Sequence, residues 1–591
     1  GGEERFVRKL EGLEADLDRE HIVLARHEER PEERVPAGQK RVDRHDRQHG
    51  FGKRQDDAHE NAELVAAVEL GRLDQRHRNA SHELRQQEHR ERRENTRQDD
   101  GPARVQKAQP VAHQGVWDQG DLVRHEHKYY IEEEKRGMAA EENLIVPGRY
   151  EIELAPNEEK TITFVCSLEE NIEEIDGKEI IKKEISRINK LIDKSNLLNS
   201  ENEELVKTYI IASDNFVVYR PSFALYTIIA GYPWFLDWGR DALISFEGLL
   251  LLSNRYEIAK EVLLTYIRDI KFGLVPNGYS GYDNRPLYNS ADASLLLFEQ
   301  VKKFLNYTKD YNFVEKNIYR SLIKVIESYI NGINHDNNNI WLDKDGLLVA
   351  GTEHTQNTWM DAKVGEYCVT PRNGKAVEIN AMWYNALKIA EELTELYGTK
   401  EQEKKYNELA EKCKKSFKEK FYNKRRKCLY DVIGDSKIRP NQLFAISLTY
   451  QVIEPNSEIA TEMFETVTKK LLNDYGLKTL AKGEPFYKEV YEGDVLKRDM
   501  SYHQGITWPW LLGIYSDAYR NRIKAEKNAK VKNELKKQYE NFRENVKQTF
   551  IKEMNENSTV GSISELYDSK KPYLAKGAFA QAWSVSEIFK I

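Results

Sequence analysis

The chain has 591 residues and a formal net charge of −8, which gives no general reason to expect a nucleic acid as partner. No apolar run approaches the ~20 residues that cross a bilayer, so we expect no membrane span. Four widely separated cysteines without a CxxC pair argue against a disulfide framework and a zinc site, and the absence of a signal-peptide pattern makes a cytoplasmic location the expectation.

The composition changes abruptly near residue 128. Eleven of the 14 histidines lie at or before His127, whereas all 32 tyrosines follow it. The segment 1–127 is rich in Arg, Glu, Gln and His and cannot bury enough apolar surface to offset its ordering entropy. We expect it to be disordered or unrelated to the rest of the chain. A tail that binds RNA or an acidic partner is the alternative, but interleaved Arg and Glu form no single-sign face.

Short alternating segments follow at 149–154 (R-Y-E-I-E-L) and 160–166 (K-T-I-T-F-V-C). They predict two or three β-strands in a β-rich segment over 128–175, a truncated N-terminal unit that is too small to be stable without packing on its neighbours. A charged amphipathic stretch then predicts a linker helix over 176–198.

From residue 199 to 591 the apolar residues have the 3.6-residue spacing of helices almost throughout. Twelve helices are predicted, at about 199–213, 241–254, 255–271, 290–306, 312–333, 378–397, 401–420, 440–452, 457–473, 502–520, 531–556 and 576–590. Long loops follow every second one, which indicates six helical hairpins. Closing them in a ring gives an (α/α)6 barrel with a funnel at one end, so the predicted fold is mainly α.

The stretch 231–248 (G-Y-P-W-F-L-D-W-G-R-D-A-L-I-S-F-E-G) brings Trp, Arg and carboxylates into a turn-rich approach to a helix. Trp faces stack on the C–H side of a pyranose, and Arg and carboxylate pairs hydrogen-bond vicinal hydroxyls. This mixture favours a sugar site, although an ion pair of Arg at the start of a core helix is the simpler structural explanation. The predicted contacts are Trp234, Asp237, Trp238, Arg240 and Asp241.

Two later loops carry further polar residues. Asn289 and Asp292 precede a predicted helix, and Ser290 is its expected N-cap. Asp343-x-Asp345 resembles the start of a calcium loop, but the later ligands are missing, so we expect a hairpin turn and no metal.

Asp361 is the first candidate for acid catalysis. It follows a Trp-Met pair that begins at Trp359 and that can desolvate it and raise its pKa, as a general acid requires. Glu378, Asn380 and Trp383 open the next helix and are further candidate contacts, although the helix dipole alone also favours a carboxylate there.

The C-terminal third supplies the remaining candidates. His503 and Gln504 lie at a predicted helix start with Trp508, and without metal-ligand spacing the histidine is a ligand-binding or structural residue. Glu565 and Asp568 form an acidic pair in the loop between the last two helices. No GxSxG motif offers a rival nucleophile.

Six strings in chain order resemble the glucosidase domain of glycogen debranching enzymes, the amylo-α-1,6-glucosidases. They are A-G-Y-P-W-F-L-D-W-G-R-D, T-W-M-D-A, V-E-I-N-A-M-W-Y-N-A-L, R-P-N-Q-L-F-A, Y-H-Q-G-I-T-W-P-W and I-S-E-L-Y-D. The resemblance runs from about Tyr129 onward. It implies an (α/α)6 barrel preceded by a β-rich domain, and inverting hydrolysis of α-1,6-linked glucose at branch points of glycogen or limit dextrin. No cofactor and no metal are expected.

By motif, the resemblance implies Asp361 as general acid, Glu565 as general base, and Arg240 with Asp241 as contacts to the non-reducing glucose. In that division of labour Asp361 has the raised pKa and Glu565 stays ionised. Two features depart from the family: Ala242 stands where Thr is usual, and 1–127 replaces most of the N-terminal domain. The alternatives are an inverting oligosaccharide phosphorylase, a glucoamylase-like hydrolase, or a catalytically dead glycogen-binding protein. The oligomeric state stays open.

Overall fold

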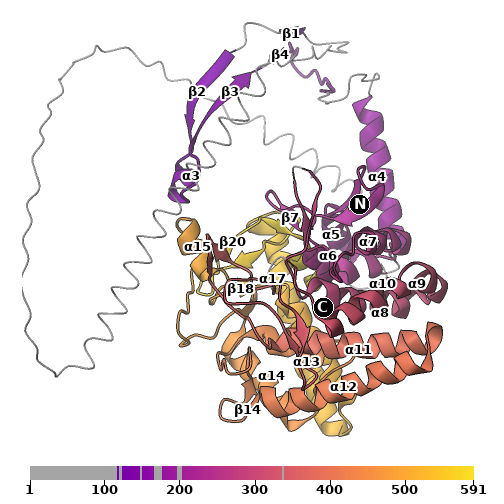
Figure 1. The fold of residues 1–591 in the computed structure, drawn as a ribbon. Coiled ribbons are helices and arrows are strands. Elements are labelled where there is room, and N and C mark those ends of the chain that lie inside the picture. The colour runs from indigo at the N-terminus through magenta and orange to yellow at the C-terminus, as the bar shows by residue number, and fades with distance from the viewer. Residues whose placement is uncertain are drawn as a thin grey trace, which may run out of the picture. The chain divides into compact units, whose positions relative to one another are not determined.

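The computed structural model describes residues 116–118, 123–146, 149–164, 176–195, 197, 203–281, 283–335 and 338–591 (Figure 1). Most of the predicted disordered segment therefore lies outside the described residues. The strand that begins at Val123 runs across the predicted boundary at residue 128.

Two small antiparallel strand pairs precede the helical region. β2 (Val123–Tyr129) pairs with β3 (Glu141–Val146), and the short helix α3 (Ile131–Lys135) connects them. β1 (Val116–Asp118) pairs with β4 (Arg149–Glu151). Neither pair is large enough to be stable alone.

The predicted strand at 149–154 is confirmed only in its first half, as β4. No strand forms over 160–164, so the second predicted strand is wrong there, and positions 165–166 lie outside the described residues. The predicted linker helix is α4 (Gly177–Lys194), whose first turn is capped by the side chain of Asp176.

From residue 203 onward the described chain is mainly helical, as predicted. Side chains of Asp310, Thr399, Ser457, Asp494 and Asn528 cap the first turns of five helices. The helices are α5 (Glu203–Asp214), α6 (Gly239–Phe246), the π-helix η1 (Glu247–Leu251), α7 (Tyr256–Arg268), α8 (Ala293–Thr308), α9 (Tyr311–Asn317), α10 (Tyr319–Asn331), α11 (Val377–Tyr397), α12 (Lys400–Phe421), the 3₁₀ helix η2 (Pro440–Leu443), α13 (Phe444–Ser447), α14 (Glu458–Leu471), α15 (Val495–Tyr502), α16 (Leu511–Ala525), α17 (Ala529–Glu556) and α18 (Ala582–Phe589).

Six of these helices contact one another in a closed order. α6 contacts α8, α8 contacts α11, α11 contacts α13, α13 contacts α16, α16 contacts α18, and α18 returns to α6. α10 and α12 contact α11, α17 contacts α16, and α5 contacts α18. Helices of the closed order are buried on nearly every side, whereas α12 and α17 keep a charged, exposed face.

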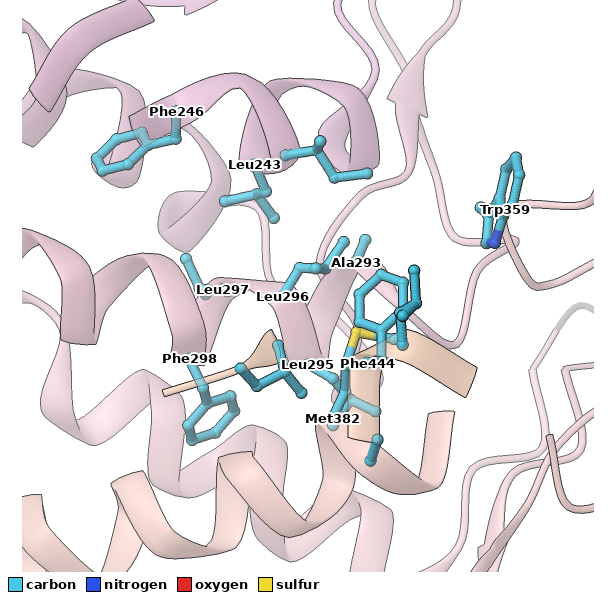
Figure 2. Packing of buried hydrophobic residues seen from close by; sticks show 14 of the residues in the cluster. Leu243, Phe246, Ala293, Leu295, Leu296, Leu297, Phe298, Trp359, Met382 and Phe444 are labelled. Atoms are coloured by element: carbon cyan, nitrogen blue, oxygen red, sulfur yellow. The ribbon is translucent and has the colours of Figure 1, made fainter. Parts of the chain in front are cut away.

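The core lies between the helices of this closed order. Figure 2 shows Leu243 and Phe246 of α6 opposite Leu297 of α8, with Phe444 of α13 beside Met382 of α11. All five side chains are buried, and burial of each such side chain contributes about 1.5–3 kcal/mol. This packing fixes α6, which carries the candidate sugar contacts.

Short antiparallel strands lie in the connections between helices. The largest sheet has the order β16–β17–β18–β19–β20, and its fourth strand directly follows Glu565. The strands are β5 (Val217–Arg220), β6 (Leu225–Ile228), β7 (Gly231–Tyr232), β8 (Gly278–Tyr279), β9 (Pro286–Leu287), β10 (Trp341–Leu342), β11 (Leu348–Val349), β12 (Lys363–Val364), β13 (Tyr367–Cys368), β14 (Tyr422–Asn423), β15 (Cys428–Leu429), β16 (Leu472–Asn473), β17 (Gly476–Lys478), β18 (Thr507–Trp508), β19 (Leu566–Tyr567), β20 (Ala575–Lys576) and β21 (Ala580–Gln581).

Several parts of the helix prediction differ from the structure. The helix predicted over 576–590 begins only at Ala582, because the residues before it form β21. The helix predicted over 312–333 is divided into α9 and α10 at Ile318. The helix predicted over 502–520 begins only at Leu511, after a Trp-Pro-Trp segment whose proline lacks a backbone N–H. The helix predicted over 440–452 ends at Ser447, where the backbone becomes extended. α15 was not predicted at all, because its eight residues are mostly charged or polar.

Within the described ranges, no helix combines the length and the apolar character that crossing a membrane requires. Cys368, Cys413 and Cys428 are buried and free.

Candidate active site

Arg240 is the centre of the candidate site. It is the second residue of α6, and it is 3% exposed. Its Nε donates a hydrogen bond to Asp292 Oδ2 and its Nη1 donates to Asp361 Oδ2, both at 2.8 Å. Arg240 Nη2 and Asp292 Oδ1 have no hydrogen-bond partner in the described part of the chain. One guanidinium thus joins carboxylates from two distant loops, and each residue of the Arg240–Asp292 pair keeps one buried polar atom without a partner among the described residues.

Two glycines determine where this segment lies. A Cβ atom at Gly239 would be 2.1 Å from the carbonyl oxygen of Pro276, so α6 can begin at this place only with glycine. A Cβ atom at Gly278 would be 3.2 Å from the indole of Trp238. The half-buried Trp238 ring therefore packs closely against the backbone at Gly278, two residues before Arg240 in the chain.

Asp361 lies on a loop, and its side chain is 32% exposed. Burial raises the pKa of Asp361, the Arg240 guanidinium lowers it, and the negative charge of Asp292 raises it again, with a net rise. Trp359, two residues earlier on the same loop, is buried in the hydrophobic core, where its ring packs edge-on against Trp510 (Figure 2). The predicted rise is confirmed, and its main cause is desolvation, as expected.

Glu565 is 2% exposed and is held by two donors. The Tyr502 hydroxyl donates to Oε1, and the backbone N–H of Ala578 donates to Oε2 at 2.8 Å. Gly577 makes room for it, since a Cβ atom there would be 2.2 Å from Oε2. Burial outweighs both hydrogen bonds and raises the pKa of Glu565 to about 7. This rise differs from the expectation that the carboxyl group keeps its ordinary pKa and stays ionised.

Asp361, Glu565 and Asp241 lie close enough to repel one another. Burial raises the pKa of Asp241 to about 8, with Arg240 lowering it and the charges of Asp361 and Glu565 raising it further. The charge of Asp361 also contributes to the raised pKa of Glu565. These carboxyl groups come from three separate elements, and the charge of one raises the pKa of another.

Two residues of this cluster were missed in the sequence. Tyr502 ends α15 and donates to Glu565. Asp499 lies in the same helix, where burial raises its pKa to about 6 and the charge of Asp361 adds to the rise. One signal for Tyr502 is present in the sequence, since this residue directly precedes the candidate pair His503 and Gln504.

Glu378 belongs to a buried ion network rather than to the exposed part of the site. Arg372 forms a bidentate ion pair with Glu378, in which Nη1 donates to Oε1 and Nη2 donates to Oε2 at 2.5 Å. Its Nε donates to Asp431 Oδ2 at 2.7 Å. All three side chains are buried. One buried guanidinium thus pairs with both carboxylates, which favours a structural role for the network.

Asn380 and Trp383 are also occupied by protein contacts. Asn380 Oδ1 accepts from the backbone N–H of Leu348 at 2.7 Å, and its Nδ2 donates to the carbonyl of the same residue at 3.1 Å. Trp383 Nε1 donates to the carbonyl of Gly346 at 3.3 Å. Both side chains are fully buried and fix the β10–β11 hairpin, so the structure gives them a structural role.

Trp359, His503 and Trp508 form a buried aromatic cluster beneath Asp361. The His503 ring stacks on Trp508, and Trp359 packs edge-on against both. Burial, together with nearby arginines, holds the pKa of His503 well below its ordinary value. Gln504 accepts from Arg439 Nη2 at 2.9 Å and donates to the carbonyl of Val369 at 3.1 Å. These residues support the loops of the site.

The remaining candidates lie near the start of α6. Asp237 is buried and paired with Arg220, although burial still raises its pKa. Asn289 is exposed and accepts from Asn277 Nδ2 at 3.1 Å. Trp234 is 59% exposed.

Two smaller predictions are resolved by the geometry. Asp292, not Ser290, occupies the N-cap position of α8, without a capping hydrogen bond, so the Ser290 prediction is wrong. The β10–β11 hairpin is confirmed, and Lys375 Nζ lies 2.6 Å from both Asp343 and Asp345. Within the described residues, no group of three or more His, Cys, Asp or Glu side chains is arranged to hold a metal.

Comparison with known proteins agrees with this geometry. The sequence model of the family described as "Amylo-alpha-1,6-glucosidase" matches residues 211–590. The glycogen debranching enzyme of Saccharomyces cerevisiae is 23% identical over 373 residues, which are 48% of this chain and 24% of the yeast protein. The chain thus matches about a quarter of that relative's length. The matched family region contains the entire cluster around Arg240 and Glu565.

Proposed function

The chain belongs to the amylo-alpha-1,6-glucosidase family, and on that premise we propose that it hydrolyses α-1,6-linked glucose at branch points of glycogen or a limit dextrin, with inversion at the anomeric carbon. The observation that carries this proposal is the meeting of Asp361, Arg240 and Glu565 in one electrostatically coupled cluster. Acid and base come from separate elements, as an inverting glycosidase requires.

Asp361 is the proposed general acid. Arg240 engages Oδ2 of its carboxyl group, so Oδ1 is the oxygen that carries the proton to the glycosidic oxygen. The pKa of Asp361 is raised by burial even beside the arginine. A carboxyl group with a raised pKa is protonated in a larger fraction of molecules near neutral pH, which is the form that donates.

Glu565 is the proposed general base. Its two oxygens each accept one hydrogen bond, from Tyr502 and from Ala578, and each keeps a second lone pair for a water molecule. Glu565 removes a proton from that water. At the same time the oxygen of the water attacks the anomeric carbon from the face opposite the leaving group. The product is β-glucose and a shortened glucan, and no glycosyl-enzyme intermediate forms.

Arg240, Asp241, Asp292 and Trp238 are the proposed contacts of the non-reducing glucose. The buried atoms without a protein partner on Arg240 and Asp292 suit hydroxyl groups, and the half-buried face of Trp238 suits the C–H face of the pyranose. A neutral sugar is favoured over an anionic ligand because three carboxyl groups surround the single arginine.

We propose further that the helical region is an (α/α)6 barrel. The closed contact order of α6, α8, α11, α13, α16 and α18 supports six inner helices, and the flanking helices supply outer partners. The short strand pairs before α4 are the proposed remnant of a β-rich domain.

The test is the release of free glucose from a branched limit dextrin, followed by proton NMR of the first anomer formed. The proposal predicts β-glucose without added phosphate. Glucose 1-phosphate formed only with phosphate would identify an inverting phosphorylase instead. Binding of the dextrin without either product would identify a glycogen-binding protein with a dead site, and α-glucose as first product would contradict inversion.

A further inference from the structure

An exposed apolar surface borders the strand that positions Glu565. β7 pairs with β21, with Gly231 opposite Gln581 and Tyr232 opposite Ala580. The segment that contains Glu565 lies on the other side of β21, because the backbone N–H of Gln581 donates to the carbonyl of Ile563 at 2.9 Å. β21 therefore lies between β7 and the segment of the proposed base.

Phe579 and Trp234 are large exposed side chains on the β21 side and the β7 side of this strand pair. Phe579 is 48% exposed and lies between Ala578, which donates to Glu565, and Ala580, which pairs with β7. Trp234 is 59% exposed and follows Tyr232 by two residues. Leu236, also exposed, extends the surface to Gly281, where a Cβ atom would touch it at 3.0 Å.

The two segments that carry these rings contain no charged residue. Residues 231–236 read G-Y-P-W-F-L and residues 577–581 read G-A-F-A-Q, so neither segment carries a Lys, Arg, Asp or Glu. Exposed aromatic rings on uncharged segments suit the C–H faces of neutral sugars, whereas peptides and nucleic acids bound through charge would find no counter-ion on these segments. A single exposed ring is ordinary, but two on neighbouring segments beside the proposed base are a candidate ligand surface.

We propose that Trp234 and Phe579 form a stacking platform for the main α-glucan chain that carries the branch, on the leaving-group side of Glu565. This inference rests on the proposed function, because it assigns the second half of the same substrate. The platform holds the chain while the single branched glucose occupies the pocket at Arg240. It accordingly sets selectivity for a glucosyl unit attached to a chain over an isolated glucosyl group.

The experiment compares two substrates with Trp234→Ala, Phe579→Ala and the double variant. α-Glucosyl fluoride has no glucan chain and reports only the pocket at Arg240, whereas a branched limit dextrin reports both halves. Each single variant is expected to lower kcat/KM for the dextrin by about tenfold relative to kcat/KM for the fluoride, because it removes one ring that contacts the glucan chain. Trp341→Ala is the matched control, since Trp341 is equally an exposed indole but lies on β10 against α10.

An equal loss of kcat/KM on both substrates would overturn the proposal, because the rings would then either contact the glucose in the pocket or only stabilise the fold. Unchanged values on both would overturn it as well. Binding can also be measured without turnover, by electrophoresis in gels that contain glycogen. Glycogen should retard the Glu565→Gln protein, and it should not retard the double variant that also carries Trp234→Ala. If the wild type releases no glucose but its retardation still needs Trp234, the proposed hydrolysis fails while the platform stands. If the variants change the oligomeric state in size-exclusion chromatography, the surface is a contact between copies and the platform is rejected.

Discussion

The hydroxyl group of Tyr502 donates a hydrogen bond to Oε1 of Glu565, so the last residue of α15 holds the proposed catalytic base. This bond favours the ionised carboxylate and is one of the two protein contacts that lower the pKa of Glu565 against the effect of burial. The tyrosine thus both orients the base and limits how far its pKa rises.

Tyr502→Phe should therefore lower kcat and move the acid limb of the kcat/KM profile to higher pH, because the base loses a donor that stabilises its charge. Tyr567→Phe is the control, since that buried tyrosine donates to Glu553 at 2.9 Å, outside the site. The control should lose stability without moving the limb. An unmoved limb in Tyr502→Phe would show that the bond is only structural.

The roles of Asp361 and Glu565 should separate with a substrate that needs little acid help. On α-glucosyl fluoride, Asp361→Asn should keep much of its rate, whereas Glu565→Gln should lose about 10²–10⁴-fold, the usual contribution of a general base. Initial-rate fluoride release measures both. Azide should give no retained product with Asp361→Asn, since no glycosyl-enzyme forms. If Glu565→Gln stays nearly as active as the wild type, Asp568 is the next carboxylate to test.

Gly577→Ala should displace the base. The position has a φ of +71°, and a Cβ atom would lie 2.2 Å from Glu565 Oε2. Gly561→Ala introduces a similar backbone strain at φ +79°, with nothing within 4 Å of its Cβ. We expect both variants to lose about 1 kcal/mol or more of stability, and only Gly577→Ala to lose kcat by about tenfold or more. Thermal unfolding and initial rates separate the two effects, and equal kcat losses would reject the steric explanation.

Arg240→Gln should raise the pKa of Asp361, because the guanidinium lowers it in the wild type. The alkaline limb of the activity profile then moves to higher pH while kcat/KM falls. Stability should drop by about 3–5 kcal/mol, the cost of leaving buried carboxylates without their cation. Arg372→Gln is the matched control, because it removes another buried guanidinium that pairs with two carboxylates, those of Glu378 and Asp431. It should cost similar stability and leave the alkaline limb in place.

Glu565 should also make stability depend on pH. Its folded-state pKa of about 7 lies above the ordinary value of 4.5, so its neutral form is favoured in the fold. The stabilisation is present below pH 4.5 and is lost as the pH rises through 7. Glu565→Gln, which cannot ionise, should be more stable than the wild type by about 1–3 kcal/mol at pH 8 and by little at pH 4.5. Urea unfolding at both pH values measures this, and a pH-independent difference would contradict it.

The helical region was predictable because its apolar spacing is regular over long stretches, as in α11 and α12. α15 was not, because an eight-residue helix reading V-L-K-R-D-M-S-Y has little apolar periodicity and depends on its Asp494 cap and on tertiary contacts. Local pattern also failed at Ser447, where η2 and α13 end in extended backbone.

The site was predictable at Arg240, Asp361 and Glu565, which lie in strings shared with the family. The same strings also suggested Glu378 and Asn380 as contacts, whereas the structure buries both in protein hydrogen bonds. A sequence string does not distinguish a polar residue that faces a ligand from one that saturates a buried arginine or a backbone group. That distinction depends on the neighbours each side chain meets in the fold.

The contact between α6 and α18 has a consequence for synthesis on the ribosome. Ser586 Oγ donates to the carbonyl of Ser245 at 2.9 Å, across a sequence separation of 341 residues. At about 5–20 residues per second, the apolar side of α6 that α18 covers waits roughly 20–70 s before its partner helix is made. During that interval the nascent chain exposes a hydrophobic surface next to Arg240, so chaperone occupancy should be highest on ribosomes stalled between these two helices.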